Sequence, residues 1–169
     1  MAADVAALLR RLNALKSKRT IVEQEWRKCY DYSMPMRGAG LATLGAATPD
    51  GSLAEGAAKK ADLLDSTATD AVRIHASALM SGLTPANSRW FGLDVGTGKE
   101  GDEDAAGKWL DEVAESIWEQ IHASNFDAVG FDCCIDMTIA GQFAMFIGEN
   151  DTGLQFEQWP LASCYFGAS

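Results

Sequence analysis

The chain has 169 residues, of which 47% are hydrophobic and 22% are charged, a balance typical of a globular domain that excludes a disordered chain. Its net charge is −10, with ten Lys/Arg and six Asp/Glu in residues 1–60 but four and eighteen in residues 61–169. An acidic surface repels phosphate, so DNA binding in a cationic groove is not expected, and solubility is the simplest role for the charge. No apolar run reaches the roughly 18 residues that span a bilayer, and no signal peptide is visible, so no membrane partner is expected.

The first predicted element is a long helix over residues 4–32, because apolar residues recur there at spacings of three and four. Asp4 suits the N-cap, and Pro35 lies just beyond the end. The apolar stripe is interrupted by Arg19 and consists of Leu8, Leu12, Leu15, Val22, Trp26 and Cys29. The basic residues on the remaining faces are Arg10, Arg11, Lys16, Lys18 and Arg19. These cations either meet an acidic neighbouring subunit or DNA, or they form a solvated face.

Residues 36–59 differ in composition from the helix before them. They contain five glycines, many alanines and the turn signal Pro49-Asp50-Gly51, with no large aromatic residue. This composition predicts an extended, mobile loop. A loop of this length is unusual inside a compact domain, and it would be explained if a partner subunit orders it.

A second helix is predicted over residues 60–83, ended by Gly82 and Pro85. One face carries mostly small residues, namely Leu64, Ala68, Ala71, His75, Ala78 and Gly82, with Val72 and Leu79 beside it. Small side chains let another helix approach closely, so we expect this helix to be central and tightly packed. His75 on this face is interpreted as a hydrogen-bonded core histidine. Residues 88–95 are then predicted to form a short strand.

Two further helices and a hairpin follow in the sequence. The helix over residues 102–123 has the apolar stripe Ala106, Leu110, Val113, Ile117 and Ile121 and an acidic opposite side. The helix over residues 126–140 has the inner face Phe126, Gly130, Cys133, Met137 and Ala140. The period then changes to two, which predicts strands over residues 142–149 and 154–159. A third strand is predicted from Ser163, and because it lacks a partner we expect the chain to be incomplete at its C-terminus. The predicted fold class is α+β, a mainly helical N-terminal region followed by a small antiparallel hairpin.

Residues that could carry chemistry are few and poorly spaced. The four cysteines include no CxxC pair, and the two histidines have no spaced partner, so buried, reduced thiols are expected in place of a disulfide or zinc site. Gly98-Lys99 lacks the earlier Gly and the following Ser or Thr of a phosphate loop. The acidic residues of the third helix are interpreted as a solvated face and not as a general acid and base. The sequence therefore predicts no catalytic, cofactor-binding or metal-binding residue.

Several short runs occur in a characteristic order. They lie at Leu64–Ala71, Leu79–Pro85, Ser88–Phe91, Phe126–Ala144 and Leu154–Pro160, and Glu25-Trp26-Arg27 with Tyr30 precedes them. Together they resemble the head-to-tail connecting (portal) proteins of short-tailed, podovirus-type bacteriophages. In that family a small-residue helix with a D-S-T start ends in S-G-L-T-P, and an R-W-F strand follows. The resemblance covers nearly the whole chain except residues 36–59 and 96–104, and Ser81–Phe91 is its most specific part.

The resemblance implies a structural subunit of a portal ring, usually a dodecamer, at one capsid vertex. Double-stranded DNA would pass through the ring during packaging and ejection without sequence-specific binding. The implied partners are other portal subunits, the terminase and tail or adaptor proteins. The implied location is the virion, and the host cytoplasm during assembly. Residues 1–169 would form the N-terminal portion of a wing-like domain, with the stem, clip and channel-lining regions beyond it.

The candidate subunit-interface residues are basic or aromatic side chains, namely Arg10, Arg11, Lys18, Arg19, Trp26, Arg89 and Trp90. Arg89 either pairs with a carboxylate of the adjacent subunit or packs within its own chain. Trp90-Phe91 either anchors the helix against the strand or makes ordinary packing contacts within the chain. The split charge suits subunits that meet head to tail. The alternative function is a small acidic adaptor module of phage or bacterial origin, which would use its long first helix to bind a partner. Neither function requires catalysis.

Overall fold

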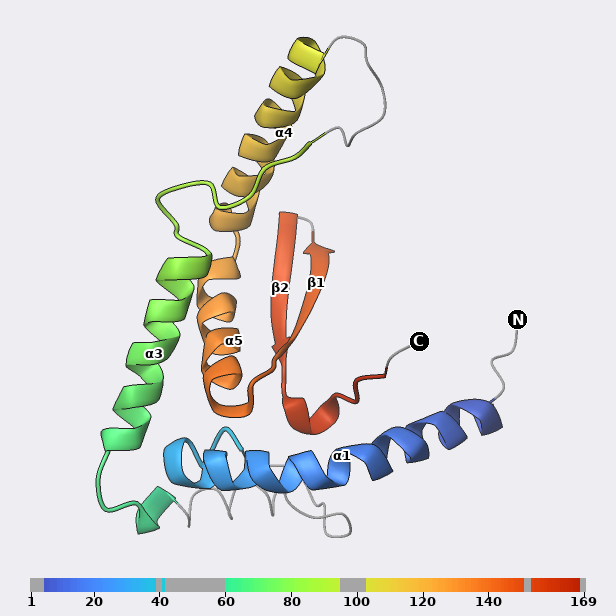
Figure 1. The fold of residues 1–169 in the computed structure, drawn as a ribbon, viewed down its shortest axis with the longest axis vertical. Coiled ribbons are helices and arrows are strands. Elements are labelled where there is room, and N and C mark those ends of the chain that lie inside the picture. The colour runs from blue at the N-terminus through green and yellow to red at the C-terminus, as the bar shows by residue number, and fades with distance from the viewer. Residues whose placement is uncertain (1–4, 39–40, 42–59, 95–102, 151–152, 168–169) are drawn as a thin grey trace.

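The computed structural model describes residues 5–38, 41, 60–94, 103–150 and 153–167. Within these residues the order is α1 (Val5–Ser33), α3 (Thr67–Leu83), α4 (Glu103–Ala123), α5 (Phe126–Ala140), β1 (Ala144–Asn150), β2 (Gly153–Trp159) and a short 3-10 helix, η1 (Leu161–Ser163). The α+β class is confirmed, with helices preceding a two-stranded antiparallel hairpin. Figure 1 shows α3 and α5 side by side, with α1 crossing below them and α4 extending above.

The buried side of α1 differs from the predicted stripe in its second half. Trp26, Tyr30 and Ser33 are buried, whereas Cys29 is exposed. Val22 is also 47% exposed. The buried side of the helix therefore includes Tyr30 and leaves out Val22 and Cys29. Trp26 and Tyr30 pack with Leu41 and Leu161 in a small core. Apart from Met36–Gly38 and Leu41, the loop predicted over residues 36–59 lies outside the described residues.

Helix α5 lies at the centre of the fold and buries residues on several sides. Phe126, Gly130 and Cys133 are buried as predicted. Met137 is 39% exposed instead, and Asp136 is almost wholly buried, at 2% exposed. A Cβ atom at Gly130 would lie 3.0 Å from the Met80 Cε atom, so glycine allows α3 to approach α5 closely here.

Helix α3 starts later than predicted and presents a different face to the core. Residues 60–62 form a separate helical turn, and the Asp65 carboxylate accepts the Thr67 N–H at 3.0 Å where α3 begins. Leu64 is therefore outside α3 and fully exposed. The small-residue face, Ala68, Ala71, His75, Ala78 and Gly82, is exposed. The buried or partly buried side of α3 carries Val72, Ala76, Leu79 and Met80, and Met80 lies beside Gly130 of α5.

The predicted strand over residues 88–95 is wrong within its described part. Residues 88–94 have no regular structure and run beside α4 (Figure 1). Arg89 joins this segment to α4, and Trp90 stacks on Phe126 with ring centroids 6.2 Å apart. The segment is held by its own side chains on α4 and α5, and not by pairing with a strand. Gly98 and Lys99 lie outside the described residues.

Helix α4 follows its prediction closely in extent and inner face. The side chains of Leu110, Val113 and Ile121 are partly buried, but Trp118 replaces Ile117, which is 37% exposed. Near its C-terminal end α4 joins an aromatic cluster, because His122 packs against both Trp118 and Phe126. The first part of α4 extends beyond this cluster, away from the rest of the fold (Figure 1).

The predicted hairpin is confirmed, and β1 pairs with β2 from Ala144↔Trp159 to Asn150↔Gly153. The Asn125 side chain occupies the outer edge of β2, since its amide both accepts the Phe156 N–H at 2.9 Å and donates to the Phe156 carbonyl at 2.8 Å. The third predicted strand is wrong. Leu161–Ser163 form η1, and the residues after it form no strand among those described.

Candidate assembly interface

A buried polar junction connects α5, α1 and the hairpin. The Asp136 carboxylate accepts hydrogen bonds from the Tyr30 hydroxyl at 2.8 Å and from the Arg37 Nε atom at 2.6 Å. The Gln158 side-chain amide donates to its second oxygen. An ionised carboxylate only accepts hydrogen bonds, and all three partners are donors. We call Tyr30, Arg37, Asp136 and Gln158 the polar junction.

The charged groups of this junction are paired with each other within the chain. Arg37 also donates to the Asp132 carboxylate at 3.0 Å and to the Asp132 carbonyl at 2.7 Å. Burial and the neighbouring Asp136 carboxylate raise the pKa of the Tyr30 hydroxyl. Burial, with Asp136 adding to it, raises the pKa of the Cys133 thiol to about 12. A protonated thiol is a poor nucleophile, so the junction stabilises the fold and provides no activated group.

Asp136 is not part of the inner face predicted for residues 126–140, yet it is buried. The available signal was an aspartate within an otherwise apolar segment, since α5 carries buried Cys133 and Ile135 immediately before it. A carboxylate inside an apolar helix has to be paired. Arg37, just after the end of α1, was the cation available to pair with it.

Arg19, predicted to interrupt the α1 stripe, instead anchors the segment that follows β2. Its guanidinium donates to the carbonyls of Leu161, Ala162 and Cys164 at 3.0, 3.1 and 2.7 Å. It also pairs with Glu23 at 3.0 Å and lies over the Tyr165 ring, 3.9 Å from its centroid. Of these carbonyls, that of Cys164 lies within the predicted third strand. The guanidinium donors of Arg19 are therefore used within the chain.

Arg89 and Trp90 also have partners within the chain. Arg89 donates to the Asp111 carbonyl at 2.9 Å and to the Asp111 carboxylate at 3.0 Å, and it lies 3.9 Å from Glu115. Trp90 packs edge-on against Phe91 and stacks on Phe126. Trp26 is buried in the small core, at 7% exposed. Of the candidates, Arg10, Arg11 and Lys18 are exposed and have no hydrogen bond or ion pair among the described residues.

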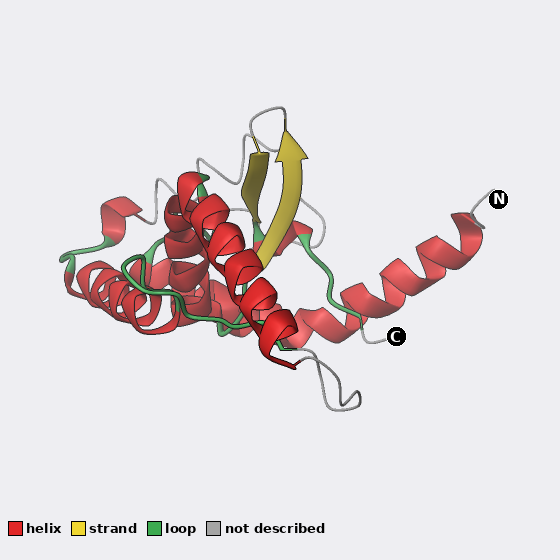
Figure 2. Cartoon of the chain, turned by 90° about the horizontal axis from the view of Figure 1, so that it is seen from above, coloured by secondary structure: helices red, strands yellow, loops and turns green. Residues whose placement is uncertain are grey.

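The first half of α1 carries these three cations and is exposed. Residues 5–11 are all exposed, and Figure 2 shows this end of the helix extending away from the other elements. The apolar side chains there are 65%, 55% and 54% exposed, for Val5, Leu8 and Leu9. Exposed apolar residues beside cations are typical of a surface that contacts another protein.

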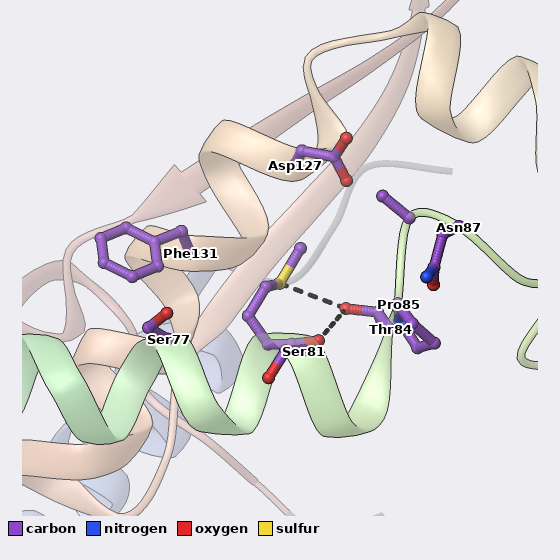
Figure 3. A pocket seen from close by; sticks show the side chains of 9 residues that line it. Ser77, Ser81, Thr84, Pro85, Asn87, Asp127 and Phe131 are labelled. Atoms are coloured by element: carbon purple, nitrogen blue, oxygen red, sulfur yellow. Dashed lines mark hydrogen bonds between the residues drawn. The ribbon is translucent and has the colours of Figure 1, made fainter.

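A groove of about 590 Å³ lies where α3 ends beside the start of α5. Figure 3 shows Phe131, Ser77, Ser81 and Asp127 around it. Met80 also lines the groove. The Thr84 hydroxyl bonds the Met80 carbonyl at 3.3 Å, and Asp127 pairs with His122 at 2.9 Å. Its lining includes Ser81, Thr84 and Pro85, from the most specific part of the resemblance. The groove thus combines an apolar floor with polar groups that bond within the chain.

The described part of the chain contains no group of three or more His, Cys, Asp or Glu residues placed to hold a metal ion. No helix in that part has both the length and the apolar character needed to cross a bilayer.

A comparison with known protein families identifies the class of protein. The family model described as bacteriophage head to tail connecting protein matches residues 5–169. The chain therefore belongs to the bacteriophage head-to-tail connecting proteins. No curated protein matches the chain significantly. Members of this structural family are not known as catalysts, and a connector is located in the virion, where it interacts with head and tail proteins.

Proposed function

We propose that the chain is a structural subunit of the phage portal ring, through which DNA is packaged and ejected, and that it has no catalytic activity. The observation that carries this proposal is the pair of exposed surfaces of opposite charge, the first half of α1 and the acidic side of α4. A contact between two different surfaces is heterologous, and it generates a closed ring when its rotation closes. A dodecamer is the expected size.

The acidic character of the chain supports passage of DNA without tight binding. Phosphate contacts dominate DNA affinity, and a net charge of −10 disfavours them. DNA then moves along the ring and is not held at one sequence. The proposed partners are further copies of the chain, the terminase during packaging and tail or adaptor proteins later. The proposed location is the portal vertex, with assembly in the host cytoplasm.

Electron microscopy of the purified protein, together with native mass spectrometry, tests this function. A closed ring of about twelve copies is the expected result. Monomers or dimers alone, at all concentrations, would overturn the proposal. Gel-shift assays on duplexes of different sequence should show equally weak binding, and a strong preference for one sequence would contradict passive passage.

A second candidate is the acidic adaptor module, favoured by the exposed apolar side chains of Val5, Leu8 and Leu9 on one projecting helix. Such a helix could dock in the groove of a different protein. The same measurement separates the two functions, because an adaptor stays monomeric until its partner is added, whereas a portal subunit assembles alone.

A further inference from the structure

Two helical surfaces of this chain project from the body. The first is the α1 arm, Val5–Lys18, which contains four Lys/Arg and no Asp/Glu. The inner side of this arm touches the C-terminal segment, where Leu15 lies beside Gly167 and Lys16 lies over the Tyr165 ring. Its outer part exposes Val5, Leu8 and Leu9 by more than half. Arg11 and Lys18 are both exposed and have no ion-pair partner in the described part of the chain.

The second surface is the outer side of α4. Its exposed residues Trp109, Glu112, Ser116 and Glu119 follow a spacing of three, four and three, so they share one helix face. We call these four residues the α4 acidic face. Trp109 is 62% exposed. Arg89 forms ion pairs with Asp111 and Glu115 on the flank of this face. Glu112 and Glu119 have no ion pair within the described residues.

The spacing of the charges on the two surfaces matches. Arg11 and Lys18 are seven residues apart, and so are Glu112 and Glu119. Seven residues of α-helix rise by roughly 10.5 Å and complete almost two turns, so each pair lies on one side of its helix. Two helices packed side by side can therefore bring both cations opposite both carboxylates.

The two surfaces cannot meet within one chain. Figure 1 shows the α1 arm and the free end of α4 projecting in different directions from opposite ends of the body, and Figure 2 shows the same separation from above. Their charges are complementary, so the occupant that fits the α4 acidic face is the α1 arm of another copy. Each copy then offers one surface of each kind, which is the requirement for a head-to-tail ring.

We infer that the α1 arm of one copy docks on the α4 acidic face of the next copy, with Arg11 and Lys18 opposite Glu112 and Glu119. Leu8, which lies on the same side of the helix as Arg11, supplies the apolar contact, and Trp109 is the aromatic anchor on the receiving side. This inference rests on the proposed ring and names the surfaces that hold it together. Because the pairs are near the surface, salt weakens the contact.

A charge swap tests the inference. One variant carries Arg11→Glu with Lys18→Glu, and the other carries Glu112→Lys with Glu119→Lys. In each variant both surfaces have the same sign, so ring formation measured by mass photometry should fall at least tenfold. An equimolar mixture should recover rings, because each arm now meets an oppositely charged face of the other variant. The chain with all four substitutions should recover them too.

Matched controls reverse exposed charges elsewhere. Lys28→Glu with Arg73→Glu, and Glu149→Lys with Glu157→Lys, change the net charge equally and should leave assembly intact. All variants should keep the wild-type melting curve, since every substituted side chain is exposed. A variant that melts early would be replaced by Arg11→Gln or Glu112→Gln, which should lower assembly to a lesser degree.

The outcomes separate this inference from the proposed function. Wild-type rings that survive both reversals, or a mixture that fails to recover, would overturn the docking and leave the portal function standing. Wild-type chains that pair through these surfaces but never close a ring would support the docking and overturn the portal function. A wild type that remains monomeric at all concentrations would overturn both.

Discussion

The polar junction and the α1 arm differ in how their side chains are used. In the junction, Tyr30 and Asp136 are each 2% exposed and every donor and acceptor described above has a partner in the chain. On the arm, Leu8 and Leu9 are more than half exposed, and Arg11 has no partner among the described residues. Folding and assembly therefore depend on different residues, and substitutions can separate the two.

The largest effect is expected at the centre of the junction. Asp136→Asn replaces an acceptor of three hydrogen bonds with a group that itself donates, and leaves Arg37 beside an uncharged amide. Breaking a buried charged pair from one side costs about 3–5 kcal/mol. Urea denaturation of the monomeric protein measures this loss. The matched control is Asp132→Asn on the same helix, which binds the same arginine but is 50% exposed, and should cost about 1 kcal/mol or less. Equal effects of the two changes would contradict the role given to burial.

A smaller loss is expected when the anchor between α1 and the C-terminal segment is removed. Arg19→Ala removes donors to three carbonyls and should cost about 2–3 kcal/mol, because hydrogen bonds to charged groups are worth about 1.5–3 kcal/mol. Arg19→Lys should recover only part of this, since a lysine cannot span the same acceptors. Hydrogen exchange should quicken in residues 161–165. Lys18→Ala, the exposed neighbour, should change stability by less than about 0.5 kcal/mol, and rapid exchange in that control would count against the anchor.

The sequence predicts those features of the fold that depend on neighbouring residues, and not those that depend on contacts between distant residues. The extents of α1, α4 and α5 and the hairpin follow from local periodicity, which survives in almost any tertiary setting. The face of α3 does not, because it depends on which helix packs against it. The small face through Ala71 and Ala78 has the helical period, but it is exposed, and Val72 and Leu79 are partly buried instead.

The candidate site was less predictable, because its contacts join residues far apart in the chain. Arg19 looked like a defect in an apolar stripe, and only the fold shows that the carbonyls of Leu161 and Cys164 lie opposite it. Arg89 was a candidate for intersubunit pairing, and Asp111 is its partner in this chain. By contrast, the exposure of Arg11 and Lys18 agrees with the solvated basic faces that the sequence indicated.

Alkaline pH should destabilise the fold around the junction. Burial raises the pKa of Cys133 from 9.0 to about 12, and that of Tyr30 also lies above its ordinary value. The unfolded chain therefore loses these protons first. Their contribution to stability is complete below the unfolded pKa of 9.0 and is lost as the pH rises above it. Each ionising group lowers the free energy of unfolding by about 1.4 kcal/mol per pH unit.

Urea denaturation between about pH 8 and pH 11 measures this slope. Cys133→Ala should flatten the first part of the decline, which starts near the unfolded pKa of the thiol. Cys29→Ala removes an exposed thiol and should leave the profile unchanged. An identical slope in the wild type and in Cys133→Ala would mean that the buried thiol does not contribute.

The smallest effect on stability is expected on α4. Trp109 is 62% exposed, so Trp109→Ala should change the free energy of unfolding by no more than about 0.5 kcal/mol. The same substitution should shift ring assembly to at least tenfold higher protein concentration, because exposed aromatic anchors dominate protein interfaces. Trp118→Ala is the matched control on the same helix, since Trp118 is partly buried against His122 and its loss should destabilise the fold. If Trp109→Ala instead lowers stability and leaves assembly unchanged, then α4 is part of the folded body and the division between body and arms is wrong.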